Sequence, residues 1–220
     1  MSIAADDLTL EELALALAPA VAQAAVFDGW TPLAVAGAAE MEGVDPDIAG
    51  LAFKGGAMDM IAAWIDSIDV AMAEAFSDEV LASMGVGQRI RAMLLFRLER
   101  MTPDREALRR ALAIMAMPQN LKRAAKLGWR SADRMWRLAG DTATDFNHYS
   151  KRAILASVYG STLAVFVDDQ SEDFAETHAF LDRRLQDVAK FGKFTARFKR
   201  DDVEHFSMMR LLGRLRYPAR

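Results

Sequence analysis

The chain contains no cysteine, which excludes disulfides, thiolate metal sites and cysteine catalysis. Histidine is scarce too, with three residues in 220. No uncharged apolar run reaches the roughly 18–20 residues that a membrane-spanning helix needs. No Lys or Arg precedes Lys54, so the N-terminus resembles neither a secretory signal peptide nor an Arg-rich transit peptide. We therefore expect a soluble or peripheral protein.

Positive charge is nearly missing from the first part of the chain. Residues 1–80 hold 15 acidic residues and one basic residue, a net charge of −14. Residues 81–220 hold 16 acidic and 26 basic residues, a net charge of +10. The composition is otherwise that of a globular protein, with 52% hydrophobic and 26% charged residues. The uneven charge bears directly on nucleic-acid and membrane partners.

The pattern of residues predicts an all-α fold of about ten helices, because Ala, Leu, Met, Arg and Glu dominate and strand-like alternation is scarce. Thr9 and Glu12 form a capping-box pattern before the first helix, and Gly29 ends it. Two short helices follow, separated by Gly43, and then a long helix over residues 57–76. This is a helix-turn-helix layout. Its apolar residues at core spacing are Phe27, Trp30, Leu33, Val35, Ala36, Ala39, Val44, Ile48 and Leu51.

The remaining residues predict a second, larger group of helices, with Pro118 as a break and Gly140 as a stop. The expected spans are residues 87–101, 104–117, 120–138, 141–168, 174–198 and 201–217. Apolar periodicity within them suggests Leu94, Tyr159, Leu163 and Phe166 as residues lining an internal pocket.

DNA binding is disfavoured although the layout matches many DNA readers. Reading DNA requires cations for the phosphates and side chains for the base edges. The expected recognition helix, residues 45–53, carries Asp45 and Asp47 but no Arg, Lys, Asn or Gln. In so acidic a region, docking on DNA would be repulsive.

The C-terminal segment is basic and amphipathic. Residues 183–220 hold 11 basic and 4 acidic residues. On a helix, an apolar arc faces away from Arg210 and Arg214. This pattern fits an interfacial helix on an anionic bilayer and, equally, a helix packed on the core with a solvated basic face. The arc consists of Met208, Met209, Leu211, Leu212 and Leu215.

The stretch GDTATDFNHYSKR, residues 140–152, has two interpretations. On a helix, Asp141, Asp145 and His148 would share one face, as in a metal or acid–base site. Alternatively, Asp141 caps the helix and Asp145 lies in its first turn. The second interpretation is favoured, because His178 and His205 stand alone in sequence and no other cluster completes a metal site. We therefore expect no catalytic residue, metal or cofactor.

Residues 117–188 resemble the Coq-nine family of ubiquinone-biosynthesis accessory proteins. The resemblance is carried by Met135-Trp136, Ala139-Gly140-Asp141, Thr144-Asp145-Phe146-Asn147, Tyr149 and Arg152-Ala153. It continues through Asp168, Asp173-Phe174, Thr177, Phe180-Leu181 and Arg183, and Gly29-Trp30 also looks like the family's.

This resemblance implies a TetR-like, non-enzymatic lipid-binding protein. It implies a helix-turn-helix unit (residues 1–56), a helical lipid-binding domain (57–200) and an amphipathic basic segment (201–220) that contacts the membrane. The expected ligand is an isoprenoid quinone intermediate, presented to the membrane-associated di-iron demethoxyubiquinone hydroxylase. The implied partner-binding patch is Met117, Pro118, Gln119, Asn120, Leu121, Asp133 and Trp136, with Gln119 where the family commonly has His.

The resemblance further implies a homodimer. Its expected location is the inner face of a bacterial membrane or, if a transit peptide has been removed, the mitochondrial matrix side. A ligand-responsive TetR-type regulator remains the alternative function. The apolar residues around Pro118, together with Trp129, Met135 and Trp136, suit either a protein-binding surface or core filling.

Overall fold

The computed structural model describes residues 7–144 and 146–201, and the side chains of residues 146 and 191–201 are outside the description. These residues form ten α-helices and no strand, which confirms the all-α prediction. The chain divides into two compact units after Leu181, and α10 runs across this boundary. The helices are α1 Leu10–Asp28, α2 Pro32–Glu42, α3 Pro46–Ala52, α4 Ala57–Ala75, α5 Asp78–Ala82, α6 Val86–Met101, α7 Arg105–Met115, α8 Leu121–Leu138, α9 Phe146–Phe166 and α10 Ala175–Asp201.

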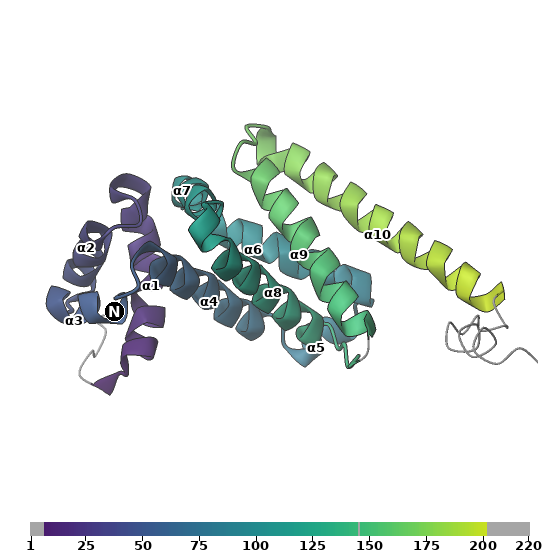
Figure 1. Cartoon of the computed structure of the whole chain (residues 1–220), viewed down its shortest axis with the longest axis horizontal. Helices are drawn as coiled ribbons and strands as arrows, with labels where there is room; N and C mark the ends of the chain where they lie inside the picture. The colour runs from purple at the N-terminus through teal and green to yellow at the C-terminus, as the bar shows by residue number, and fades with distance from the viewer. Residues whose placement is uncertain (1–6, 145, 202–220) are drawn as a thin grey trace, which may run out of the picture. The chain divides into compact units, whose positions relative to one another are not determined.

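The first three helices form the helix-turn-helix unit, in which α1 packs on both α2 and α3 (Figure 1). Thr9 and Glu12 cap α1 through a reciprocal pair of hydrogen bonds, as the sequence predicts. Gly29 ends α1 with a φ of 68°, and Gly43 ends α2 in the left-handed region with a φ of 73°. Glycine suits both positions because a β-carbon disfavours this backbone conformation.

Part of the predicted core of this unit is wrong. Trp30, Val35, Ala39 and Val44 are buried as expected. Four others are exposed, and Ala36 is half-buried. Apolar spacing identifies a face but not the neighbour that covers it. The exposed residues, with their accessible fractions, are Phe27 (84%), Leu33 (65%), Ile48 (38%) and Leu51 (47%).

Trp30 joins the helix-turn-helix unit to the larger bundle. Its indole Nε1 donates a buried hydrogen bond of 2.9 Å to the carbonyl oxygen of Ala107 on α7. Its ring lies 5.5 Å from the ring of Trp64 on α4, measured between centroids. Because α4 also packs on α1, α6, α7 and α8, it is the central helix of the first unit (Figure 1).

Two described stretches meet the length and composition of a membrane-spanning helix. One is α1, and the other is the pair α3 and α4 taken as one span with a bend of 84°. The buried face of α1 packs on α2 and α4, as in the core helix of a globular domain.

The second half of the bundle follows the predicted order with shifted boundaries. The helix α7 ends at Met115, and a short 3-10 turn, Pro118–Asn120, leads into α8. Gly140, with a φ of 88°, follows the end of α8 as predicted. The helix predicted from residue 141 begins only at Phe146. The last predicted helix, residues 201–217, lies outside the described residues apart from its first residue.

Candidate functional site

An apolar cavity of about 480 Å³ lies among α4, α6, α7, α8 and α9. Small residues on α8 and α9 keep the space open: Gly128 and Gly160 line it, and a β-carbon at either would meet no atom within 4 Å. The residues lining it are Ile61, Trp64, Ile65, Met101, Leu108, Ala111, Leu112, Met115, Ala116, Ala124, Ala125, Leu127, Gly128, Trp129, Ser131, Ala156, Tyr159, Gly160 and Leu163.

The lining residues divide into an opening and a buried end. Ala116, Ala125 and Gly160 are exposed, so the cavity opens between the end of α7, α8 and α9. Ile61, Trp64, Met101, Leu108, Ala111, Leu127, Ser131, Tyr159 and Leu163 are buried. An apolar ligand that entered through this opening would therefore be removed from water on several sides.

Two of the four residues suggested from sequence line this cavity. Tyr159 and Leu163 do, whereas Leu94 and Phe166 are 1% exposed core residues that do not. Phe166 packs instead on Phe174, with ring centroids 5.0 Å apart. The walls that α4, α7 and α8 contribute were not among the predicted residues. The run of small residues on α8, Ala124, Ala125 and Gly128, is the signal that could have indicated the opening.

A buried ionic network lies behind the cavity. The guanidinium of Arg97 on α6 is fully buried and pairs with Asp69 on α4. The Nη2 atom of Arg97 donates a hydrogen bond of 3.2 Å to Ser131 Oγ. The Ser131 hydroxyl in turn donates to Asp69 Oδ2, also at 3.2 Å. The Oδ2 atom of Asp69 also pairs with Arg134 Nη1, at 3.2 Å. The charges are thus compensated, as burial requires.

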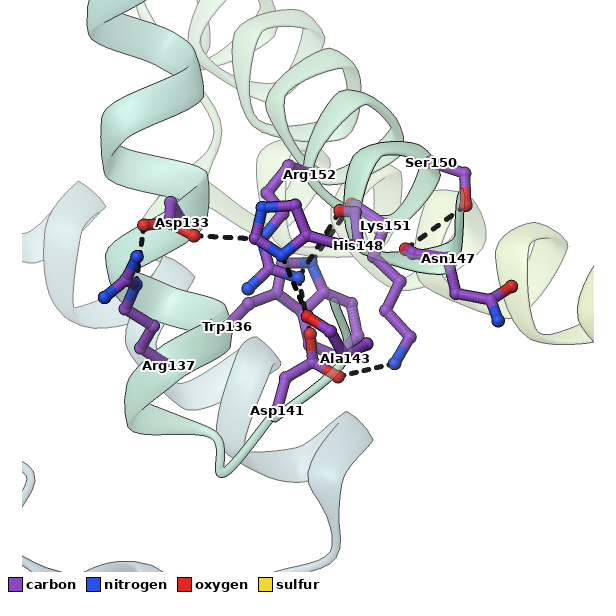
Figure 2. A network of polar contacts seen from close by, with 10 residues as sticks. All are labelled: Asp133, Trp136, Arg137, Asp141, Ala143, Asn147, His148, Ser150, Lys151 and Arg152. Carbon is purple, nitrogen blue, oxygen red and sulfur yellow. Dashed lines mark hydrogen bonds and ion pairs between the residues drawn. The ribbon is translucent and has the colours of Figure 1, made fainter. Parts of the chain in front are cut away.

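A second hollow, of about 420 Å³, lies at the other end of α8 and α9 and is polar. Arg152, which is 1% exposed, is its centre: its Nε donates to Asp133 at 3.0 Å and its Nη1 pairs with Asp141. Lys151 Nζ also pairs with Asp141, at 2.6 Å. Figure 2 shows these side chains converging from α8, α9 and the segment between them.

The electrostatics of this network favour the ionised carboxylate. Burial acts to raise the pKa of Asp141, but hydrogen bonds from Lys151 and Arg152 outweigh it, so the pKa lies below its usual 3.8. Burial acts to lower the pKa of Arg152, but Asp141 and Asp133 raise it. Both shifts favour the charged forms, so Asp141 stays ionised and Arg152 stays protonated at neutral pH.

The predicted cap at Asp141 is wrong. Asp141 to Thr144 are not helical, and the carboxylate of Asp141 binds Lys151 and Arg152 in place of backbone N–H groups. Asp145 lies outside the described residues. The row of Asp141, Asp145 and His148 does not form along one helix face, since α9 starts at Phe146.

His148 makes local structural contacts that its place in the sequence does not predict. Its Nδ1 lies 3.0 Å from the carbonyl oxygen of Ala143 (Figure 2). Its ring lies edge-on to the ring of Tyr149, with centroids 5.1 Å apart. Across residues 7–144 and 146–201, no three His, Asp or Glu side chains are grouped as a metal site.

The expected partner-binding residues occupy two places rather than one. Met117, Pro118, Gln119 and Leu121 are exposed beside the cavity opening, and Asn120 is half-buried. The amide of Asn120 donates to Ile114 O at 2.8 Å, so Asn120 supports the turn. Asp133 and Trp136 belong to the ionic end of α8. At about 1.5 Å per residue, Leu121 and Trp136 are separated by roughly 22 Å along the helix axis.

Trp136 also has a structural role. Its Nε1 donates to the carbonyl oxygen of Lys151 at 3.0 Å, and the Lys151 ammonium lies 5.3 Å from the ring centroid. Trp136 is therefore half-buried between α8 and α9. The predicted membrane-contact residues Met208, Met209, Leu211, Leu212, Leu215, Arg210 and Arg214 lie outside the described residues.

Both ends of the α8–α9 pair fall within a match to a known family. The model of the COQ9 family matches residues 121–192. Ubiquinone biosynthesis protein COQ9 of Rattus norvegicus is 32% identical over 171 residues, which cover 74% of this chain and 54% of that protein. The Homo sapiens protein of the same name gives the same values. The resemblance to the COQ9 family is confirmed.

The match to COQ9 has a limited extent. The chain spans about half the length of the curated relatives it matches. A probable COQ9 protein of Dictyostelium discoideum is 27% identical over 182 residues, covering 80% of this chain and 58% of that protein. These names describe the relatives as mitochondrial proteins of ubiquinone biosynthesis.

The fold also matches a solved structure, which confirms the TetR-like architecture. A TetR transcriptional regulator from Nitrosomonas europaea superimposes with a TM-score of 0.59, covering 81% of this chain and 97% of the regulator. The sequence identity is 18%, so this likeness concerns the fold alone.

Proposed function

We propose that this chain is a non-catalytic lipid-binding protein of ubiquinone biosynthesis, which holds an isoprenoid quinone intermediate in its apolar cavity. The observation that carries the proposal is the cavity itself. Its volume, about 480 Å³, is within the roughly 300–1,000 Å³ of small-molecule sites. Its aliphatic and aromatic walls favour an apolar ligand through the hydrophobic effect.

The proposed partner is the membrane-associated di-iron demethoxyubiquinone hydroxylase. The exposed apolar residue Met117 follows Ala116, and exposed Leu121 lies one helical turn before Ala125 on α8; Ala116 and Ala125 both line the cavity opening. A partner docked on this junction would meet the ligand where it leaves the cavity. Asp133 and Trp136 would then act at the far end of α8, by holding α8 on α9 or by a second contact.

The remaining parts of the proposal follow from the resemblance to COQ9. They are a homodimer, membrane contact through the basic C-terminal segment, and a location on the inner face of a bacterial membrane or the mitochondrial matrix side. The proposal that the chain does not catalyse a reaction also follows from this resemblance. The ion pairs at the other end of α8 and α9 support it, because Arg152 and Lys151 neutralise the carboxylates of Asp133 and Asp141.

Cells lacking this chain provide the test. Ubiquinone and its demethoxy precursor are measured by chromatography after rescue with the wild-type chain, with Gly128→Phe, or with Gly50→Phe. The first variant fills the cavity, and the second is its control, because Gly50 is exposed on α3 with no atom near its β-carbon. Wild type and Gly50→Phe should restore ubiquinone, whereas Gly128→Phe should accumulate the precursor. Full rescue by Gly128→Phe would refute the proposal.

The alternative function is a ligand-responsive TetR-type regulator, and the fold likeness is the observation that favours it. The helix α3 argues against it, because its seven residues begin at an acidic cap where Asp45 accepts from the Asp47 N–H at 2.8 Å. Salt-dependent binding of the purified chain to DNA fragments from its own gene neighbourhood would favour the regulator.

A further inference from the structure

Two hydroxyl groups interrupt the apolar wall of the cavity, both at its buried end. Ser131 on α8 is 1% exposed, and Tyr159 on α9 is 6% exposed. Apart from the two tryptophans, the other lining side chains carry nothing more polar than a thioether. A cavity made only for hydrocarbon would not require such groups, since burying them without strong partners is unfavourable.

The hydroxyl of Ser131 already has strong partners. It accepts from Arg97 Nη2 and donates to Asp69 Oδ2, each at 3.2 Å. Its proton is therefore committed to the buried ionic network. Ser131 contributes to holding Arg97 in place and does not need a ligand.

The hydroxyl of Tyr159 is different. Its proton points to the sulfur of Met101 at 3.7 Å, and a thioether is a weak acceptor. The guanidinium carbon of Arg97 lies 4.9 Å from the centre of its ring, and Arg97 Nε is buried without a hydrogen-bond partner among the described residues. The proton of the Tyr159 hydroxyl therefore has only a weak acceptor, which is unusual for a buried polar group.

The protonation of Tyr159 also suits a donor. Burial raises the pKa of the phenol, and the positive charge of Arg97 together with its hydrogen bond to the phenol opposes this only in part. The phenol therefore keeps its proton near neutral pH and can donate it to an oxygen atom.

We propose that Tyr159 donates a hydrogen bond to an oxygen on the ring of the bound quinone intermediate, so that the ring lies at the buried end and the isoprenoid tail extends toward the opening. This inference rests on the proposed function. The opening suits the tail, because Ala116, Ala125 and Gly160 offer no polar side chain there. Delivery of the ring to a partner then requires the ligand to move outward from Tyr159.

The test compares two ligands on the same variant. Displacement of N-phenyl-1-naphthylamine measures the affinity for a ubiquinone with two isoprene units and for farnesene, a hydrocarbon without oxygen. Tyr159→Phe should weaken quinone binding about tenfold, equivalent to about 1.4 kcal/mol, and leave farnesene binding within about twofold. The control is Thr162→Val on the same helix, whose buried hydroxyl bonds Val158 O at 2.8 Å outside the cavity lining. It should change neither affinity.

The outcomes separate this inference from the proposed function. Unchanged quinone affinity in Tyr159→Phe overturns the hydrogen bond, and so does an equal loss for both ligands, which would indicate packing. If the wild-type chain binds neither ligand, the proposed function itself fails.

Discussion

The two ends of the α8–α9 pair differ in how the helices meet. At one end, small side chains such as Gly128 and Gly160 leave an apolar cavity open. At the other, Arg152 reaches from α9 to carboxylates on α8 and the following segment, and charges fill the contact (Figure 2). The pair is therefore held by ion pairs at the end where it does not need to open. The difference suggests that stability and ligand capacity are assigned to separate ends.

Breaking the ionic end should have the largest effect. Arg152→Leu leaves Asp133 and the buried Asp141 without their shared partner, so the free energy of unfolding should fall by about 3–5 kcal/mol. Urea denaturation followed by circular dichroism measures it. The control is Arg137→Leu, because Arg137 is 71% exposed at its side chain and pairs with the same Asp133. That variant should lose no more than about 1 kcal/mol. Equal losses in both variants would contradict the central role of Arg152.

The apolar end should determine partner binding. Leu121 is 55% exposed beside the opening, so Leu121→Asp should weaken hydroxylase binding about tenfold, equivalent to about 1.4 kcal/mol, without lowering stability. Biolayer interferometry with the purified hydroxylase measures the affinity. Lys122→Asp, on the next exposed residue, introduces the same side chain and serves as the control. If both variants weaken binding equally, charge and not the apolar contact is responsible.

Acid should weaken the ionic end and spare the apolar one. The pKa of Asp141 is lower in the folded state than in the unfolded chain, so its stabilisation is present above the unfolded value of about 3.8 and is lost as the pH falls through the folded value. Asp141→Asn should remove about 1–2 kcal/mol at pH 7 and flatten the loss of stability below pH 4. Urea titrations at several pH values check this. A variant with the same acid dependence as wild type would show that Asp141 does not contribute.

Local signals predicted much of this fold. The Thr9–Glu12 box, Gly29, Gly43 and Gly140 are recognisable because their effect spans only a few residues. The local pattern predicts Asp141 as a helix cap, but its partners, Lys151 and Arg152, are ten and eleven residues away and leave no trace in that pattern. Apolar spacing predicts Phe27 and Leu33 in the core, but it does not show which neighbour covers a face, and both are exposed.

Only two of the four predicted pocket residues line the cavity, for a similar reason. Tyr159 and Leu163 follow from the apolar periodicity of α9. The other walls come from α4, α7 and α8, and their meeting depends on contacts between helices distant in sequence. The weak partner of Tyr159, a sulfur 58 residues away, has no local signature at all.

Mass spectrometry of lipid extracted from the purified chain tests the central claim most directly. The account predicts that an isoprenoid quinone or its precursor co-purifies with wild type and with Gly50→Phe, and that Gly128→Phe yields at most a tenth as much while remaining folded. Wild-type protein without isoprenoid lipid, or equal lipid in Gly128→Phe, would contradict the account.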